Sequence, residues 1–134
     1  VLAFLMPIVA SMGGNAGMQT LAVTVRTLAT NDLTKNNISQ NILKEFNIGI
    51  LNGIIFAIIS AIIVQLWFED SLLSMIISIS MIVTMVVAGL FGIVVPITLK
   101  KMNIDPAIAS SVFVTTITDV IGFVSFLGVS AYFF

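Results

Sequence analysis

One carboxylate stands inside a long apolar stretch near the end of the chain. Asp119 lies thirteen residues after Pro106, which is about 20 Å along a helix axis at 1.5 Å per residue. A central Asp costs about 2.5–3.5 kcal/mol on insertion scales, and such residues usually face a protein interior or a water-filled cavity. Asp119 therefore predicts either a cation pathway or a buried partner. The structural alternative is an ion pair, for which Arg26 is the nearest candidate by residue type.

Small and polar side chains accompany Asp119 along one side of its expected helix. They follow one another at steps of four, three, four and three residues, with Asp119 on their border: Ser111, Thr115, Thr118, Gly122 and Ser125. Such a stripe can line a water path, but Ser, Thr and Gly also let two helices approach closely. The spacing alone fits both interpretations, and the carboxylate favours the water path.

A second unusual segment lies in the middle of the first apolar stretch. Residues 12–19 contain three glycines and two amides: Gly13, Gly14, Gly17, Asn15 and Gln19. Glycine weakens a helix, and broken helices occur in membranes where the freed backbone groups line a cavity. The pattern predicts either a helix break at a pore or a glycine-rich packing face. If this turn stays helical, Asn15 and Gln19 point the same way because they are four apart.

The chain offers only oxygen and amide ligands, because it contains no His and no Cys. Such ligands suit a hard cation, and the missing residues exclude thiol nucleophiles and nucleophile–base pairs, so we do not expect an enzyme. One carboxylate cannot cage a bare Mg²⁺, which sheds its waters reluctantly. Two chains would bring two copies of Asp119 together around a hydrated ion and favour a divalent cation. These ligands do not distinguish Mg²⁺ from Mn²⁺, Ca²⁺ or a proton relay.

The composition requires lipid as the main solvent for the elements that position these residues. The chain of 134 residues is 59% hydrophobic and 8% charged, whereas a soluble domain carries about 25% charged residues. Its few cations form no basic stripe, so nucleic acid is not an expected partner. Three windows hold no charge and a fourth holds only Asp119: 1–25, 46–68, 71–99 and 106–134. Each reaches the roughly 20 residues that a membrane-spanning helix needs.

We therefore predict an all-α, polytopic membrane bundle of four helices, with spans at about 1–28, 43–68, 71–99 and 106–134 in one pore domain covering 1–134. Asn41 is expected to cap the second span, with Glu45 in its first turn. Asp70 is expected to cap the third span. Asp105, followed by Pro106, is expected to begin the fourth.

Two pairs of small residues predict close contacts between helices. Gly49 and Gly53, and likewise Ala88 and Gly92, are each four residues apart on an expected helix. Small residues at this spacing let neighbouring helices approach each other closely in a membrane.

The loop charges predict the orientation of the chain. The cations lie between the first and second of the four windows and between the third and fourth: Arg26, Lys35, Lys44, Lys100 and Lys101. The turn at 69–70 carries two acids instead. By the positive-inside rule, loops 29–43 and 100–105 are cytoplasmic and both termini face outside. An outside start without a signal peptide predicts that an earlier span belongs to the intact protein.

Two groups of residues resemble one family. Residues 6–7 and 12–20 (MP and MGGNAGMQT), continuing to 25–29, closely resemble the second membrane helix of MgtE-type magnesium channels. Residues 105–110 (DPAIAS) and 115–123 (TTITDVIGF) resemble their last helix. Both motifs occur in the expected order, and the resemblance covers essentially the whole chain.

The resemblance implies a homodimer in a plasma membrane, the bacterial inner membrane, with its ion path at the subunit interface. It further implies five spans in the intact membrane domain, preceded by cytosolic regulatory domains that this sequence does not include. Hydrated Mg²⁺ would be the transported ion, and it would bind in the pore at Asp119. Thr115 and Ser111 map to positions that help to line that site.

The expected function is passive permeation of Mg²⁺, with other divalent ions such as Mn²⁺ as further candidates. Two alternatives stay open at this stage. A secondary transporter would use Asp119 as a protonatable site, and its uptake would follow an imposed proton or sodium gradient. A non-conducting anchor subunit would bind partners without carrying ions.

Overall fold

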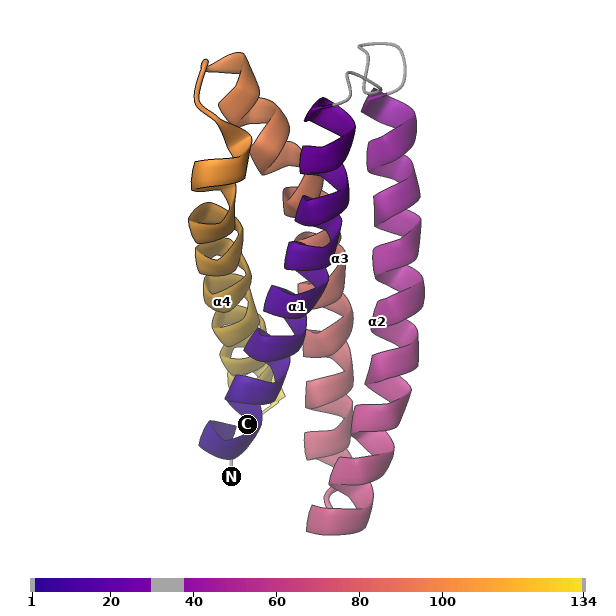
Figure 1. Cartoon of the computed structure of the whole chain (residues 1–134). Coiled ribbons are helices and arrows are strands. Elements are labelled where there is room, and N and C mark those ends of the chain that lie inside the picture. The colour runs from indigo at the N-terminus through magenta and orange to yellow at the C-terminus, as the bar shows by residue number, and fades with distance from the viewer. Residues whose placement is uncertain (1, 30–37, 134) are drawn as a thin grey trace.

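The computed structural model describes residues 2–29 and 38–133, which form four helices and no strand. Figure 1 shows them in chain order: α1 (Leu2–Ala29), α2 (Ile38–Phe68), α3 (Ser71–Lys101) and α4 (Pro106–Phe133). The all-helical prediction is confirmed, and each helix follows one of the predicted spans. Lys35 and much of the first loop lie outside the described residues.

Three of the four described helices are long and apolar enough to cross a membrane. They contain the candidate spans Ser39–Phe68, Ser71–Lys101 and Pro106–Phe133. α1 has 28 residues, which is also long enough, but the glycines and amides at its centre lower its mean hydropathy. That α1 also crosses the bilayer, like the orientation of the bundle, stays a prediction.

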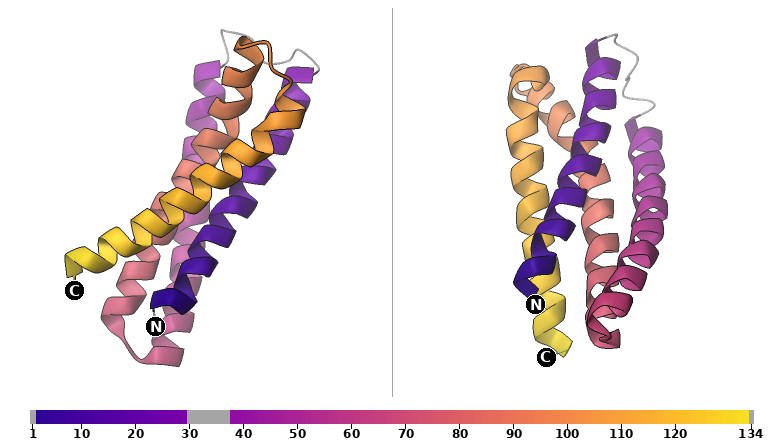
Figure 2. Two further views of the ribbon diagram at one scale, coloured as in Figure 1. Left: turned by 90° about the vertical axis from the view of Figure 1, so that its left-hand side faces the viewer. Right: turned by 60° about the horizontal axis from the view of Figure 1, so that its bottom comes forward.

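α3 is the central helix of the bundle. It packs against α1, α2 and α4, and α1 packs in addition against α4. α2 contacts α3 extensively but approaches α1 far less closely, as Figure 1 also shows. Figure 2 shows α4 leaning obliquely across the other helices. Both ends of the described chain lie at the same end of the bundle as the α2–α3 turn.

Local chemistry sets several helix ends as predicted. The Asp70 carboxylate accepts hydrogen bonds from the backbone N–H groups of Leu72 and Leu73 at 3.0 and 3.2 Å, so it caps α3. Asp105 accepts from the N–H of Ala107 at 3.0 Å, and α4 begins at Pro106. Both predicted caps are confirmed, and each satisfies backbone donors that a helix start leaves unpaired.

The predicted start of the second span was wrong. α2 begins at Ile38, so Asn41 lies inside the helix rather than at its cap, and Glu45 lies well beyond the first turn. No Gly or Pro interrupts residues 38–45, so the helix continues past the charge-free window into polar sequence. A charge-free window marks the apolar part of a helix and not its end.

Glycines let the backbones of neighbouring helices come into close contact. A Cβ on Gly53 would lie 2.9 Å from the Ile82 Cα, and one on Gly49 would lie 3.0 Å from the Val86 Cα. Gly92 similarly meets Thr20 of α1. The predicted small-residue contacts are therefore confirmed, and they fix α2 and α1 on either side of α3.

Candidate cation site

α4 presents one continuous buried line to the rest of the bundle. Its buried residues recur every four positions: Ser110, Val114, Thr118, Gly122, Phe126 and Ser130. Gly122 is needed here because a Cβ would lie 3.1 Å from the Ala10 Cα of α1. The polar stripe predicted on α4 is thus divided, since Thr118 and Gly122 belong to the packing face.

Asp119 lies at the edge of that packing face and is half-buried, although its neighbour Thr118 is fully buried. Thr118 contacts the α1 glycines, with its Cγ2 3.3 Å from the Cβ position of Gly17. Asp119 therefore lies beside the middle of α1 and not near a helix end. The exposed residues near it on α4, Val120 and Val124, are apolar.

Within the described residues, the Asp119 carboxylate has no hydrogen-bond partner and no ion pair. The alternative considered for Asp119, an ion pair with Arg26, is absent, because Arg26 lies in the last turn of α1. That is nine residues beyond Gly17, or about 13 Å along the helix. The interpretation of Asp119 as half of a structural salt bridge is therefore wrong for this structure.

Thr115 and Ser111 lie on the same side of α4 as Asp119, one and two turns earlier. Thr115 is exposed and Ser111 is half-buried. The Thr115 hydroxyl donates to the sulfur of Met18 on α1 at 3.8 Å, and the Thr115 carbonyl oxygen accepts the Thr118 hydroxyl at 3.0 Å. The three predicted metal ligands thus share one partly exposed edge of α4, next to α1.

The glycine-rich segment of α1 is a packing face and not a break. α1 is helical without interruption from Leu2 to Ala29. Gly13 and Gly17 are buried, and a Cβ on Gly13 would collide with the Thr84 side chain of α3. Gly14 is half-buried and faces the Thr118 hydroxyl at 3.9 Å from its Cβ position. Of the two predictions for this segment, the helix break is therefore wrong.

The two amides of the same segment point away from the packing face. Asn15 and Gln19 are both exposed, and because α1 stays helical they lie on one side of it, as predicted. They carry the polar character of α1 onto its outer surface. Their part in lining an ion path stays a prediction.

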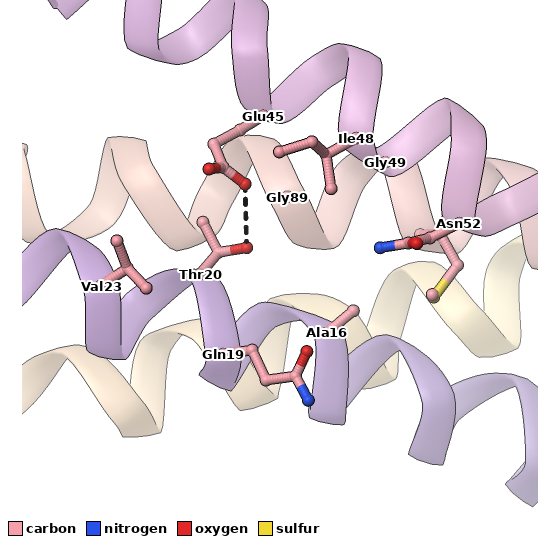
Figure 3. A pocket seen from close by; sticks show the side chains of 10 residues that line it. Ala16, Gln19, Thr20, Val23, Glu45, Ile48, Gly49, Asn52 and Gly89 are labelled. Atoms are coloured by element: carbon pink, nitrogen blue, oxygen red, sulfur yellow. Dashed lines mark hydrogen bonds between the residues drawn. The ribbon is translucent and has the colours of Figure 1, made fainter.

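The sequence did not identify a polar hollow between α1 and α2, which Figure 3 shows. It has a volume of about 170 Å³, and its polar lining residues are Gln19, Thr20, Glu45 and Asn52. The amide of Gln19 points away from Glu45 (Figure 3). The Thr20 hydroxyl donates to the Glu45 carboxylate at 3.3 Å. The available signal was that Asn52 follows Glu45 by seven residues, or two helical turns, which puts both on one side of α2.

No group of three or more acidic, His or Cys side chains gathers in the described part of the chain. A cage around a dehydrated ion takes six or more oxygen ligands, and no cluster of carboxylates in the described residues supplies them. Single carboxylates with nearby hydroxyls and amides instead suit an ion that keeps its water shell.

Comparisons with known proteins show which family the chain resembles. A family model named MgtE and described as a divalent cation transporter matches residues 6–129. Proteins named magnesium transporter MgtE from Bacillus subtilis and Enterococcus faecalis are 35% and 32% identical over 132 and 133 residues, 98% and 99% of this chain. One from Thermus thermophilus is 33% identical over 129 residues, 96% of this chain. The chain spans 28–29% of the length of these relatives.

Proposed function

This chain belongs to the MgtE family of divalent cation transporters, and we propose that it forms part of the membrane pore of a magnesium channel. In this proposal hydrated Mg²⁺ passes passively along the outer edge of α4 and α1. Asp119 holds the ion there through its water shell. The magnesium in the names of the relatives supports the choice of ion.

The observation that carries the proposal is the state of Asp119. Its carboxylate is half-buried in an apolar helix and has no ion pair among the described residues. A carboxylate in that position is costly unless it meets water or a cation. A passing divalent ion offsets that cost. The attraction between the ion and the carboxylate is stronger there than in bulk water, because the surroundings are apolar.

Asp119 acts with Thr115 and Ser111 as an outer-shell site. The carboxylate supplies the negative charge, and the two side-chain hydroxyls bind the waters of the ion. An ion held through water leaves more easily than a caged one, which permeation requires. Mg²⁺ suits this arrangement because it usually keeps several waters in its protein sites.

A homodimer completes the pore in this proposal. One chain offers one carboxylate on an outer edge of the bundle, and a second copy facing the same edge would double the negative charge. Two carboxylates around one axis favour a divalent over a monovalent ion. The dimer places α1 and α4 at the interface and leaves the exposed apolar side of α2, including Ile58 and Ile62, to the lipid.

In the cell this bundle would lie in the plasma membrane, the bacterial inner membrane. The three helices that are apolar enough to span a bilayer support a membrane location. By the positive-inside rule, Lys100 and Lys101 support a cytoplasmic position for the α3–α4 connection.

The decisive experiment replaces Asp119 by Asn in the full-length protein and measures Mg²⁺ flux into liposomes. We expect flux to fall about tenfold or more, because a hydrogen bond to a charged group contributes ~1.5–3 kcal/mol and 1.4 kcal/mol is a factor of ten. The matched control is Asp70→Asn, since Asn caps a helix as well as Asp does. The control should conduct like the unaltered protein.

Three results would reject the proposal. Unchanged flux and ion preference in Asp119→Asn would remove Asp119 from the ion path. Uptake of Mg²⁺ driven by an imposed proton or sodium gradient would favour coupled transport. No flux from intact, folded protein that still binds a partner would favour an anchor subunit.

A further inference from the structure

The polar hollow between α1 and α2 is built by the way the helices pack. α1 and α2 both lie against α3 but not closely against each other. Gly89 of α3 holds the first part of α2 close, since its Cβ position lies 3.0 Å from the Glu45 carbonyl oxygen. The Glu45 side chain must then extend over α3 toward α1. Figure 3 shows it facing Thr20 across the hollow, with Asn52 projecting from α2 into the same space.

The hollow is large enough for an ion with its waters. Its volume is about 170 Å³, whereas one buried water needs roughly 10–15 Å³ on a comparable measure. Its walls combine one carboxylate, one hydroxyl and two amides, all of which can hydrogen-bond to water. None of its lining residues is Lys or Arg.

Glu45 is under-used by the protein itself. Its only partner among the described residues is the Thr20 hydroxyl, at a long 3.3 Å. Lys44 lines an adjoining hollow together with Glu45, but no ion pair within 4.0 Å joins them. A carboxylate can accept about four hydrogen bonds, so most of the acceptor capacity of Glu45 is not used by the described residues.

We propose that this hollow is a second site for a hydrated divalent cation, held by Glu45 with Thr20 and Asn52 through bridging waters. Oxygen and amide ligands select a hard ion such as Mg²⁺ or Mn²⁺. The site is separate from Asp119, because α1 lies between them: Thr118 contacts α1 at Gly14 and Gly17, and Glu45 contacts it at Thr20. The ion would bridge α1 and α2, which otherwise have little contact.

Methionine methyl groups give a separate reporter for each site. Met85 lines the hollow, and Met18 contacts Thr115 beside Asp119. Mn²⁺ can be titrated into the full-length protein in nanodiscs while the broadening of labelled Met methyl resonances is followed. To remove the Asp119 site from the measurement, Met85 is followed in the Asp119→Asn background.

In that background we expect Mn²⁺ to broaden Met85 with a saturable titration. Adding Glu45→Gln should raise the half-saturating Mn²⁺ concentration about tenfold or more, the loss typical of an outer-shell partner. The matched control, Glu69→Gln, removes a carboxylate from the exposed α2–α3 turn and should leave the titration unchanged. Mg²⁺ should compete with Mn²⁺ at the same site.

An unchanged titration in Glu45→Gln would overturn the proposal, and so would Met85 broadening that is already lost in Asp119→Asn alone. If Glu45→Gln fails to fold, Thr20→Val and Asn52→Leu test the same hollow. If neither of these variants changes the Mn²⁺ titration of Met85, the proposed site is rejected. The pore proposal is judged separately, by whether adding Asp119→Asn changes the Mn²⁺ response of Met18 in the Glu45→Gln background, from which the second site has been removed.

Discussion

At the scale of single residues, neighbours on α4 have very different surroundings. Thr118 is fully buried against α1 glycines, whereas Asp119 is half-buried and free of protein partners in the described chain. A rotation of one residue, about 100° on a helix, separates a packing position from a candidate ion site. Adjacent positions on one helix can therefore differ in whether they pack against another helix or stay open to a passing ion.

Thr115 and Thr116 offer a matched test of that difference. Both are exposed, but only Thr115 shares the side of α4 that carries Asp119. We expect Thr115→Val to reduce Mg²⁺ flux by up to about tenfold, since one hydrogen bond is worth roughly 0.5–1.5 kcal/mol. Thr116→Val should have no effect on flux. Equal fluxes in the two liposome preparations would show that the Thr115 hydroxyl takes no part in ion passage.

At the scale of helices, glycine contacts rather than side-chain interlocking set the distance between α2 and α3. The contact at Gly53 is with the backbone of Ile82, which cannot rotate away as a side chain can. Close backbone approach increases dispersion contacts, which replace the hydrophobic effect as a driving force inside lipid.

Gly53→Ala should therefore push α2 away from α3 and destabilise the bundle by about 1–3 kcal/mol, the usual cost of overpacking. Gly128→Ala is the control, because nothing lies within 4 Å of its Cβ position. That variant should be at least as stable as the unaltered protein, since Ala favours helix over Gly. SDS-induced unfolding, followed by the fluorescence of Trp67, measures both. Two equal midpoints would argue against a tight α2–α3 contact.

The glycine-rich segment of α1 shows why element-scale predictions can fail. Glycine weakens an isolated helix by removing its conformational bias. In the bundle, the same lack of a side chain lets Gly13 and Gly17 accommodate Thr84 and Val114. Contacts with two neighbouring helices stabilise α1, so propensity does not decide its structure.

At the scale of the whole molecule, one open question is which face meets a second copy. The proposed pore requires the Asp119 edge of α4 to face its counterpart and leaves the outer side of α2 to lipid. The chain contains no Cys, so single cysteines can report on this directly.

Thr115→Cys should form a dimer with a short bismaleimide cross-linker in membranes, because both copies of the site would face one axis. Ile62→Cys, at an exposed position of α2, should stay monomeric under the same treatment. Denaturing gel electrophoresis separates the two products. Cross-linking through α2 but not through α4 would place the interface on the wrong face for the proposed pore.

The sequence by itself determined the helices, most of their chemistry and the position of the central carboxylate. An apolar window indicates whether a segment needs apolar surroundings. A capping residue such as Asp70 or Asp105 forms hydrogen bonds with the next two or three residues. Both are local effects, so they are readable without knowledge of the fold. The start of α2 was missed because its polar first turns lie outside its apolar window.

Only the tertiary structure decided which side of each helix is buried. It divided the α4 stripe, made Gly13 and Gly17 a packing face, and excluded the alternative ion pair of Asp119 with Arg26. It also created the Glu45 hollow, which exists because α1 and α2 each pack on α3 and leave a space between them. These outcomes depend on which helices are neighbours, and periodicity within one helix does not contain that information.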